Sequence, residues 1–291
     1  MEILNSIQNE FSNIEKIRNS MIVAKKIQLH SGIDGYDSPQ AYGIYRNNGG
    51  QPLGVVGKDF EPMDLNIFLD VIIQSCVQAD LDMSKLSYKE YANGSKVIFE
   101  LPLKQYQIAT PMLGDTLATK LQFKTGFDGL TKVSLGFYAY RLWCSNGAKG
   151  WRKDIDLSFK NTYGNKGKIA LFTNEIISTI SNVEKYTSDL GKLTKIAVTQ
   201  KDIDIFFKKL TGNSLADDKE LTTRKRNILD KINQSVAIEM QNTGANMFSL
   251  LQGITRYTTH EMANASEEKL MFTAAAKYSD KAHELAFEYL N

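Results

Sequence analysis

The order of the secondary-structure patterns predicts an α+β fold. Strand-like alternation and two hairpin turns lie within residues 1–167, whereas helical periodicity fills the chain from about Lys168 onward. Strands followed by a run of helices are typical of α+β proteins, while alternating strands and helices would indicate a doubly wound nucleotide-binding sheet. We therefore expect a sheet-containing region at 1–167 and a helical region for packing or assembly at 168–291.

Residues 1–20 predict a short amphipathic helix. Charged residues, among them Glu10, Glu15 and Arg18, interrupt its apolar positions, so the segment lacks the continuous apolar core of a signal peptide. No later window approaches the roughly 18 uncharged apolar residues that would cross a membrane. Two cysteines, Cys76 and Cys144, cannot build a disulfide framework. We expect a cytoplasmic protein with no membrane partner.

Two hairpins are predicted from their turn residues. The segment 41–62 has two short apolar runs around Asn47–Gly50, and Asn and Gly tolerate the positive φ values of tight turns. Asp128-Gly129 lies between strand-like segments at 119–127 and 132–144, and a further strand is expected at 95–103.

The remaining segments have the three-and-four spacing of apolar residues that is typical of helices. In 63–81 this spacing includes Cys76, which we interpret as a buried small hydrophobe rather than a nucleophile or ligand, because free cysteines are among the most buried residues. Five further helical patterns occupy 169–186, 202–210, 220–240, 246–262 and 268–290.

The chain has a net charge of +2, from 35 basic and 33 acidic side chains, but the charge is unevenly distributed and one segment is strongly basic. Residues 120–168 hold ten Lys or Arg against three Asp or Glu, a local net charge of +7, with nine aromatic residues that include both tryptophans. Cations neutralise a phosphate backbone, and flat rings stack on unpaired bases at about 1–3 kcal/mol each. No helix-turn-helix, zinc-finger or basic-zipper signature indicates a duplex reader. The segment therefore predicts a single-stranded nucleic-acid ligand.

Strand geometry selects the candidate residues, because successive side chains point to opposite faces. We expect Val133, Leu135 and Phe137 on a buried face, and lysines and tyrosines on the outer face of the hairpin, followed by a basic loop. The candidate nucleic-acid-binding residues are Lys120, Lys124, Lys132, Tyr138, Tyr140, Arg141, Lys149, Trp151, Arg152 and Lys153. The alternative interpretation is a solvated surface that prevents edge pairing, with the rings in the core.

No motif specifies a reaction. Phosphate-binding loops, dinucleotide fingerprints and hydrolase or metalloprotease motifs are absent. His30, His260 and His283 lie on separate segments without partners at metal-ligand spacing. Two acidic pairs would suit Mg²⁺ in a nuclease but have a spacing that is common on surfaces, namely Asp154/Asp156 and Asp202/Asp204. We expect no catalytic residue, no metal and no cofactor.

Three blocks in order, at 41–63, 125–147 and 245–262, resemble an uncharacterised family of phage and plasmid proteins, described simply as phage/plasmid-like. The resemblance implies a mobile-element origin. The order of hairpin, helix, strands and basic hairpin is also similar to the Red-beta/Erf superfamily of single-strand annealing proteins. That likeness implies a curved antiparallel sheet packed on a helix, assembled into rings or filaments with single-stranded DNA in a basic groove.

These observations predict a phage or plasmid protein that binds single-stranded DNA and anneals or protects strands in replication or recombination, without covalent chemistry. The expected partners are single-stranded DNA and further copies of the chain, in the host cytoplasm if a phage encodes the protein. The alternative is a structural or interaction protein of a mobile element that oligomerises through its helices and binds no nucleic acid.

Overall fold

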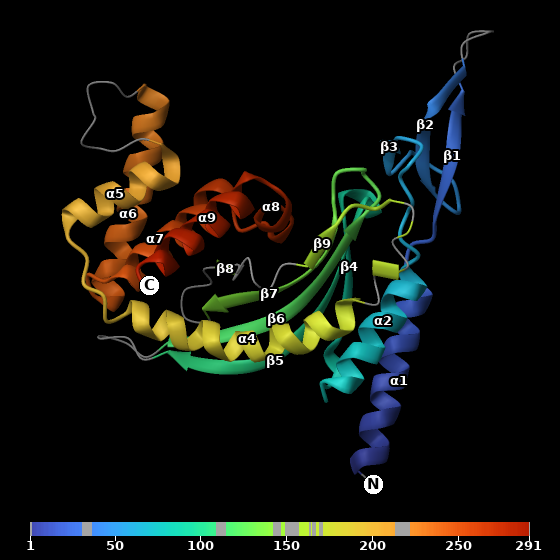
Figure 1. Ribbon diagram of the computed structural model, residues 1–291, viewed down its shortest axis with the longest axis horizontal. Helices are drawn as coiled ribbons and strands as arrows, with labels where there is room; N and C mark the ends of the chain where they lie inside the picture. Colours follow the sequence, from blue (N-terminus) through green and yellow to red (C-terminus); the bar gives the residue numbers. More distant parts are fainter. Residues whose placement is uncertain are drawn as a thin grey trace. The chain divides into compact units, whose positions relative to one another are not determined.

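A computed structural model of the chain describes residues 2–30, 37–108, 115–141, 147–148, 157–162, 164, 167–168, 171–212 and 222–290. Its α+β element order is drawn in Figure 1. The chain forms two compact units, unit 1 from residues 1–102, 121–136 and 155–180, and unit 2 from 103–120, 137–154 and 181–291.

Unit 1 begins with the predicted N-terminal helix, α1 (Glu2–Ser20), and a small antiparallel sheet. Its strands are β1 (Ala24–His30), β2 (Asp37–Arg46) and β3 (Gly54–Val56), in that order across the sheet. The predicted turn at 47–50 joins β2 to β3, and the amide of Gly49 donates to the carbonyl of Arg46 at 3.0 Å. The first hairpin is therefore confirmed, whereas β1 was not predicted.

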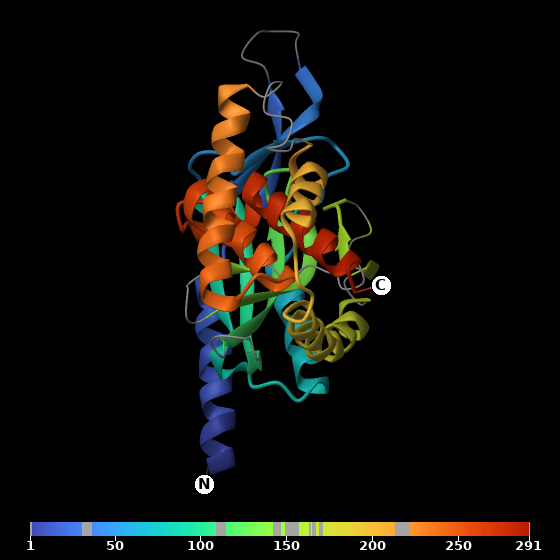
Figure 2. The ribbon, with the colours of Figure 1, turned by 90° about the vertical axis from the view of Figure 1, so that its left-hand side faces the viewer.

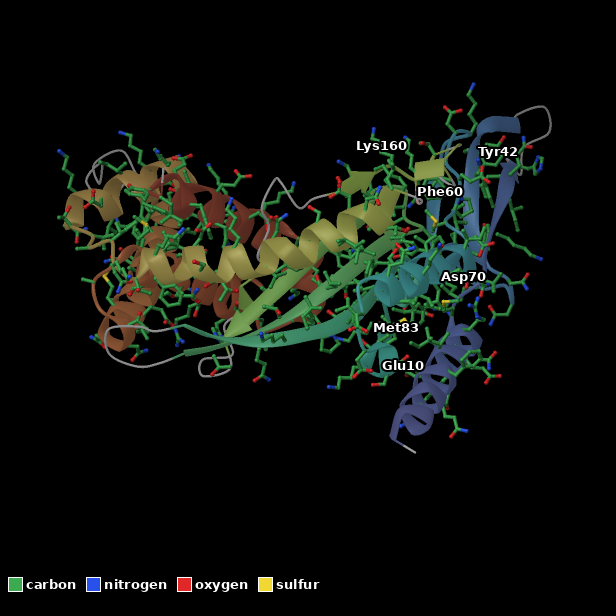
Figure 3. All side chains as sticks on the ribbon, turned by 60° about the horizontal axis from the view of Figure 1, so that its bottom comes forward. Glu10, Tyr42, Phe60, Asp70, Met83 and Lys160 are labelled. Carbon is green, nitrogen blue, oxygen red and sulfur yellow. The ribbon has the colours of Figure 1, made fainter. Side chains whose placement is uncertain are left out.

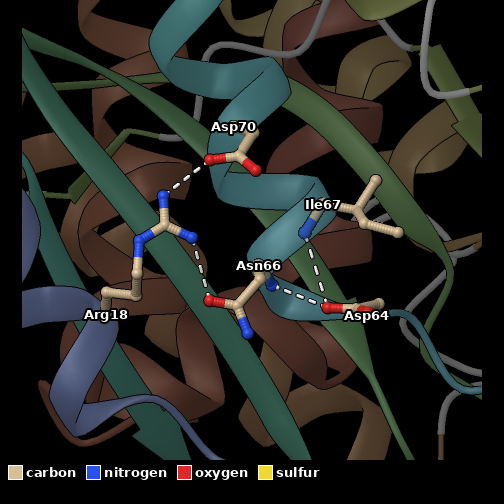
Figure 4. Close-up of polar contacts among 5 residues, drawn as sticks. All are labelled: Arg18, Asp64, Asn66, Ile67 and Asp70. Atoms are coloured by element: carbon tan, nitrogen blue, oxygen red, sulfur yellow. Dashed lines mark hydrogen bonds and ion pairs between the residues drawn. The ribbon is translucent and has the colours of Figure 1, made fainter.

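Helix α2 (Leu65–Gln78) confirms the helix predicted at 63–81. The Asp64 carboxylate caps its first turn by accepting from the amides of Asn66 and Ile67 (Figure 4). Arg18 of α1 reaches the same turn, with Nη1 donating to Asn66 Oδ1 at 2.9 Å and Nη2 lying 2.6 Å from Asp70 Oδ1. These bonds fix the end of α1 against α2.

The second sheet is antiparallel where its register is described and contains the basic hairpin. It has the order β4 (Ser87–Tyr91), β5 (Lys96–Ile108), β6 (Asp115–Gly126), β7 (Val133–Arg141), β8 (Gly147–Ala148), with β9 (Leu157–Phe159) paired to β7. Short 3₁₀ turns, η1 (Met83–Lys85) and η2 (Ala92–Gly94), flank β4. The predicted strands at 95–103 and 119–127 are confirmed, and the strand predicted at 132–144 is confirmed over 133–141, with 142–144 outside the described residues. Strands β4 and β9 were not predicted.

The core of unit 1 lies between α2 and this sheet. Phe68 of α2 meets Phe99 of β5 edge-to-face, with ring centroids 5.8 Å apart. Cys76 is fully buried on the same helix, and burial raises the pKa of its thiol to about 12, so it is a packed hydrophobe as interpreted from the sequence.

The expectation that β6 has a solvent-facing side is wrong. Residues 121–127 are all buried, and Lys124 is only 4% exposed. The polar side chains on this side of the sheet bond to one another. Gln122 Nε2 donates to Glu100 Oε1 at 2.7 Å, and the other Glu100 oxygen lies 2.8 Å from Lys89 Nζ. Alternation of polar and apolar residues along β6 therefore reflects an internal polar ladder rather than contact with water.

Unit 2 contains most of the described helices. They are the second half of α4 (Leu171–Leu193), then α5 (Gln200–Thr211), α6 (Thr223–Thr243), α7 (Met247–Tyr257), the π-helical turn η5 (Thr258–Met262), α8 (Glu267–Phe272) and α9 (Ala274–Glu288). The long helix α6, orange in Figure 2, packs against α7, which is buried on nearly all sides. The predicted helical C-terminal region is confirmed.

An aromatic cluster organises the core of unit 2. Tyr186 of α4 lies between Phe137 of β7 and Phe287 of α9, with centroid distances of 4.9 and 5.4 Å. Phe137, one of the rings in the basic segment, is therefore a core residue. Within the described part of the chain, no helix is both long and apolar enough to span a bilayer.

Candidate nucleic-acid interface

A pocket of about 320 Å³ opens in unit 1 beside the turn between β6 and β7. We call it the hairpin pocket. Its walls come from three segments, at 55–60 in the end of β3 and the loop that follows, at 128–132 in the turn, and at 160–162 after β9. Lys132, one of the predicted nucleic-acid-binding residues, lies on its wall.

The predicted Asp128-Gly129 turn forms one wall. Asp128 Oδ1 accepts from the amides of Leu130 and Thr131 at 2.9 and 2.7 Å, and Oδ2 accepts from the Thr131 hydroxyl at 2.8 Å. This bonding is an Asx-type cap, which Asp favours in turns. The carboxylate charge of Asp128 is thus engaged inside the turn.

A glycine lets the second wall approach the first. A Cβ on Gly54 of β3 would lie 2.5 Å from the carbonyl oxygen of Phe127 and 2.6 Å from Cα of Asp128, closer than side-chain carbons can come to backbone atoms. The bare backbone of β3 therefore packs directly against the start of the turn.

Lys26 of β1 supports the segment that follows β3. Its Nζ donates to the carbonyls of Lys58 and Phe60 at 2.5 and 2.7 Å and lies 4.3 Å from the ring centroid of Tyr42. Tyr42 and Phe60 are labelled in Figure 3. A lysine held by two carbonyls and an aromatic face has a fixed position, so this cation belongs to the framework of the pocket rather than to its opening.

The third wall is tied to the turn by Asn161. Its buried Nδ2 donates to the carbonyls of Gly126 and Thr131 at 2.9 and 3.3 Å, and the amide of Glu61 donates to the Asn161 carbonyl at 3.1 Å. A bridge between Phe60 and Thr162 joins the same segments. The three walls are therefore connected by hydrogen bonds of the backbone and of the Asn161 side-chain amide.

Two lysines give the pocket its positive charge. Lys132 and Lys160 are exposed and line it, and neither has an ion-pair or hydrogen-bond partner among the described residues. Lys160 is labelled near Phe60 in Figure 3. Asp128 accepts from three donors of its own turn, so Asp59 is the lining carboxylate that has no hydrogen bond or ion pair with the described residues.

The opening of the pocket is apolar. Leu130 is 87% exposed and Val55 is 60% exposed, and both line it together with the partly buried Phe60. Exposed large apolar side chains beside unpaired cations suit a ligand that has both an anionic and a flat apolar part. A nucleotide has this composition.

The other predicted residues have mixed positions. Lys120 lies 3.3 Å from Glu267 of α8 and is largely buried, and Lys124 is buried, so the expected shared outer face with Lys132 is not formed. The reason is that this side of β6 is buried, and Gln122 belongs there to the internal polar ladder with Glu100. Tyr138, Tyr140 and Arg141 lie in β7, but their side chains are outside the described part of the structure. Outside the described residues altogether are Lys149, Trp151, Arg152 and Lys153.

Phe123 and Phe127, like Phe137, are fully buried rather than exposed for stacking. Of the two acidic pairs, Asp154/Asp156 lies outside the described residues. Asp202 is the third residue of the capping box that Thr199 begins at α5, and hydrogen bonds from the hydroxyl and amide of Thr199 lower the pKa of its carboxyl group. Its neighbour Asp204 accepts from Gln200 Nε2 at 3.3 Å.

Sequence reasoning missed most of the pocket. Val55 and Leu130 are ordinary apolar residues of predicted hairpins, and no local pattern marks them as exposed. Lys160 belongs to the basic segment but was not selected, because its position next to the turn depends on the pairing of β9 with β7.

Comparison with known proteins places the chain in a family without assigning an activity. A family model described as a domain of unknown function (DUF932) matches residues 52–283. The chain belongs to the DUF932 family. All three walls of the hairpin pocket fall inside the part of the chain that this DUF932 model covers. No curated protein and no solved structure matches the chain.

Proposed function

We propose that this DUF932 protein binds single-stranded DNA and that the hairpin pocket holds one nucleotide of the strand. The observation that carries the proposal is that Lys132 and Lys160, two cations without described partners, line the same pocket as the exposed apolar residues Leu130 and Val55. The phosphate would lie between the lysines, and the base would pack on Leu130 and Val55. Such contacts depend little on base identity, as in proteins that bind single strands without sequence preference.

In line with the resemblance to phage and plasmid proteins and to strand-annealing proteins, we propose that several copies of the chain hold the strand for annealing or protection in the cytoplasm. No covalent step is required. A strand that is held extended finds its complement with less loss of conformational freedom than a free coil. The local net charge of +7 in residues 120–168 supports a polyanionic partner for this part of the chain.

The proposal is tested with the double variant Lys132→Gln, Lys160→Gln. Fluorescence anisotropy with a labelled oligothymidylate, over a series of salt concentrations, should give weaker binding for the variant. The slope of log K against log salt should become shallower by about 0.7, because the two lysines hold one phosphate and each neutralised phosphate of a single strand contributes about 0.7.

The matched control is Lys16→Gln on α1, an exposed lysine outside the pocket, which should bind like the wild type. Wild-type protein that binds no oligonucleotide, or a double variant that keeps the wild-type affinity and slope, would contradict the proposal.

A second function, as an interaction protein that oligomerises through its helices, is favoured by α1. Phe11 is 75% exposed there, and Ile17 is the buried residue among the side chains described in this helix. An exposed aromatic residue on an amphipathic helix is typical of a surface that pairs with another helix. This function predicts an oligomer that dissociates on Phe11→Ser in size-exclusion chromatography with light scattering, and elution that is unchanged by added oligonucleotide.

A further inference from the structure

The outer face of the small sheet in unit 1 continues the hairpin pocket. In the register of the sheet, Ile27 lies opposite Gly43, and Gly43 lies opposite Val55, so these residues share one face across all three strands. Ile27 is 51% exposed and Val55 is also exposed, so this face is turned to solvent. Val55 also lines the hairpin pocket, so the pocket and this face meet at the edge strand β3.

Tyr45 covers the centre of this face. It lies two residues beyond Gly43 on β2 and therefore on the same side of the sheet. A Cβ on Gly43 would contact Cε2 of the Tyr45 ring and lie 3.0 and 3.1 Å from its Cζ and Oη. The ring thus lies across the glycine, in space that any other residue at position 43 would fill. Tyr45 is partly exposed, so its remaining surface is open to solvent.

Lysines stand at both ends of this apolar track. Lys25 is the cross-strand partner of Tyr45 and is exposed on the same face. At the other end, beyond Val55, lie the two lysines of the hairpin pocket. A row of apolar and aromatic surface with cations at its ends matches a chain of bases with phosphates at regular intervals.

We infer that the outer face of β1–β2–β3 is a stacking platform for further nucleotides of the strand, with Tyr45 stacking on one base and Lys25 neutralising a phosphate. The inference rests on the proposed function, because it extends the same strand from the hairpin pocket across Val55. A protein partner on this face is the competing occupant. The charges favour the nucleic acid, because three exposed lysines, Lys25, Lys132 and Lys160, lie on this track and in the pocket against the carboxylate of Asp59, which is unpaired among the described residues. The ring of Tyr45 lies across Gly43 instead of projecting from the sheet.

The test compares two lengths of labelled oligothymidylate in fluorescence anisotropy. An oligonucleotide of about three nucleotides places one nucleotide in the hairpin pocket and leaves most of the platform uncovered, whereas one of about twelve also covers the platform. Tyr45→Leu, which removes the ring but still covers Gly43, should weaken binding of the long oligonucleotide by about 5-fold to 100-fold and leave the short one unchanged. Tyr45→Phe, which keeps the ring, should bind both like the wild type.

Lys25→Gln gives a second measurement that does not depend on how Tyr45→Leu folds, because Lys25 is exposed. It should make the salt slope shallower by about 0.7 for the long oligonucleotide only. Failure of wild-type protein to bind either length contradicts the proposed function itself. Binding that depends on Lys132 and Lys160, but is indifferent to Tyr45→Leu and Lys25→Gln, overturns the platform alone. Equal losses for both lengths would overturn it too, by placing Tyr45 within the pocket.

Discussion

At the scale of single residues, His283 is the buried ionisable group with the clearest consequence. It lies on α9 in unit 2, fully buried, with Nδ1 2.8 Å from the carbonyl oxygen of Ser279. No described group bonds to its Nε2. Burial lowers the pKa of this imidazole from 6.5 to about 4, so the folded protein holds it neutral.

This pKa makes folding sensitive to acid. Above about pH 6.5 the ring is neutral in both states and has no effect on the pH dependence. Between about pH 6.5 and pH 4 the unfolded chain binds a proton that the folded chain does not. The free energy of unfolding therefore decreases as the pH is lowered through this range. Urea unfolding followed by circular dichroism should show a loss of about 2 kcal/mol between pH 7.5 and pH 5 that His283→Gln does not share. An identical pH profile for wild type and His283→Gln would contradict this account.

At the scale of elements, the turns were the most predictable parts of the chain, because their chemistry is local. Asn47–Gly50 and Asp128-Gly129 carry their own signals in residues that tolerate positive φ or cap the turn. The strands beside them were found for the same reason. The exposure of their faces was not predictable, because Lys124 has the same alternation as a surface lysine yet is buried next to the Glu100–Gln122 ladder.

The Asp128 turn is both a folding element and a wall of the hairpin pocket. Asp128→Ala removes three hydrogen bonds that its carboxylate accepts, and we expect the free energy of unfolding to fall by about 1–2 kcal/mol. Asp59→Ala is the matched control, since it removes a carboxylate from the same pocket without breaking a turn. It should change stability by less than about 0.5 kcal/mol. Equal effects of the two variants in urea unfolding would show that the turn does not depend on the Asp128 cap.

At the scale of the whole molecule, the order of elements gave the α+β class but not the way the chain divides. Strands and then helices suggested a boundary near residue 168. The compact units instead combine distant segments, and strands β5, β6 and β7 each contribute residues to both units. Compactness depends on contacts between residues far apart in the sequence, which periodicity does not report.

These long-range contacts predict that a chain cut between residues 167 and 168 gives fragments that do not fold alone. In unit 1, Ser75 Oγ donates a hydrogen bond to Thr173 Oγ1 at 3.0 Å, and in unit 2 the ring of Tyr186 packs on Phe137. The cut therefore separates contacting residues in the core of each unit. We expect fragment 168–291 to retain helical signal in circular dichroism, because its helices carry local caps such as Thr199 and Asn246, but to lose the cooperative thermal transition of the full chain. Mixing it with fragment 1–167 should restore that transition if the buried faces re-form. A sharp transition in the isolated fragment, at the temperature of the full chain, would instead mean that the helices are an independent domain and that the contact of Tyr186 with Phe137 adds little to their stability.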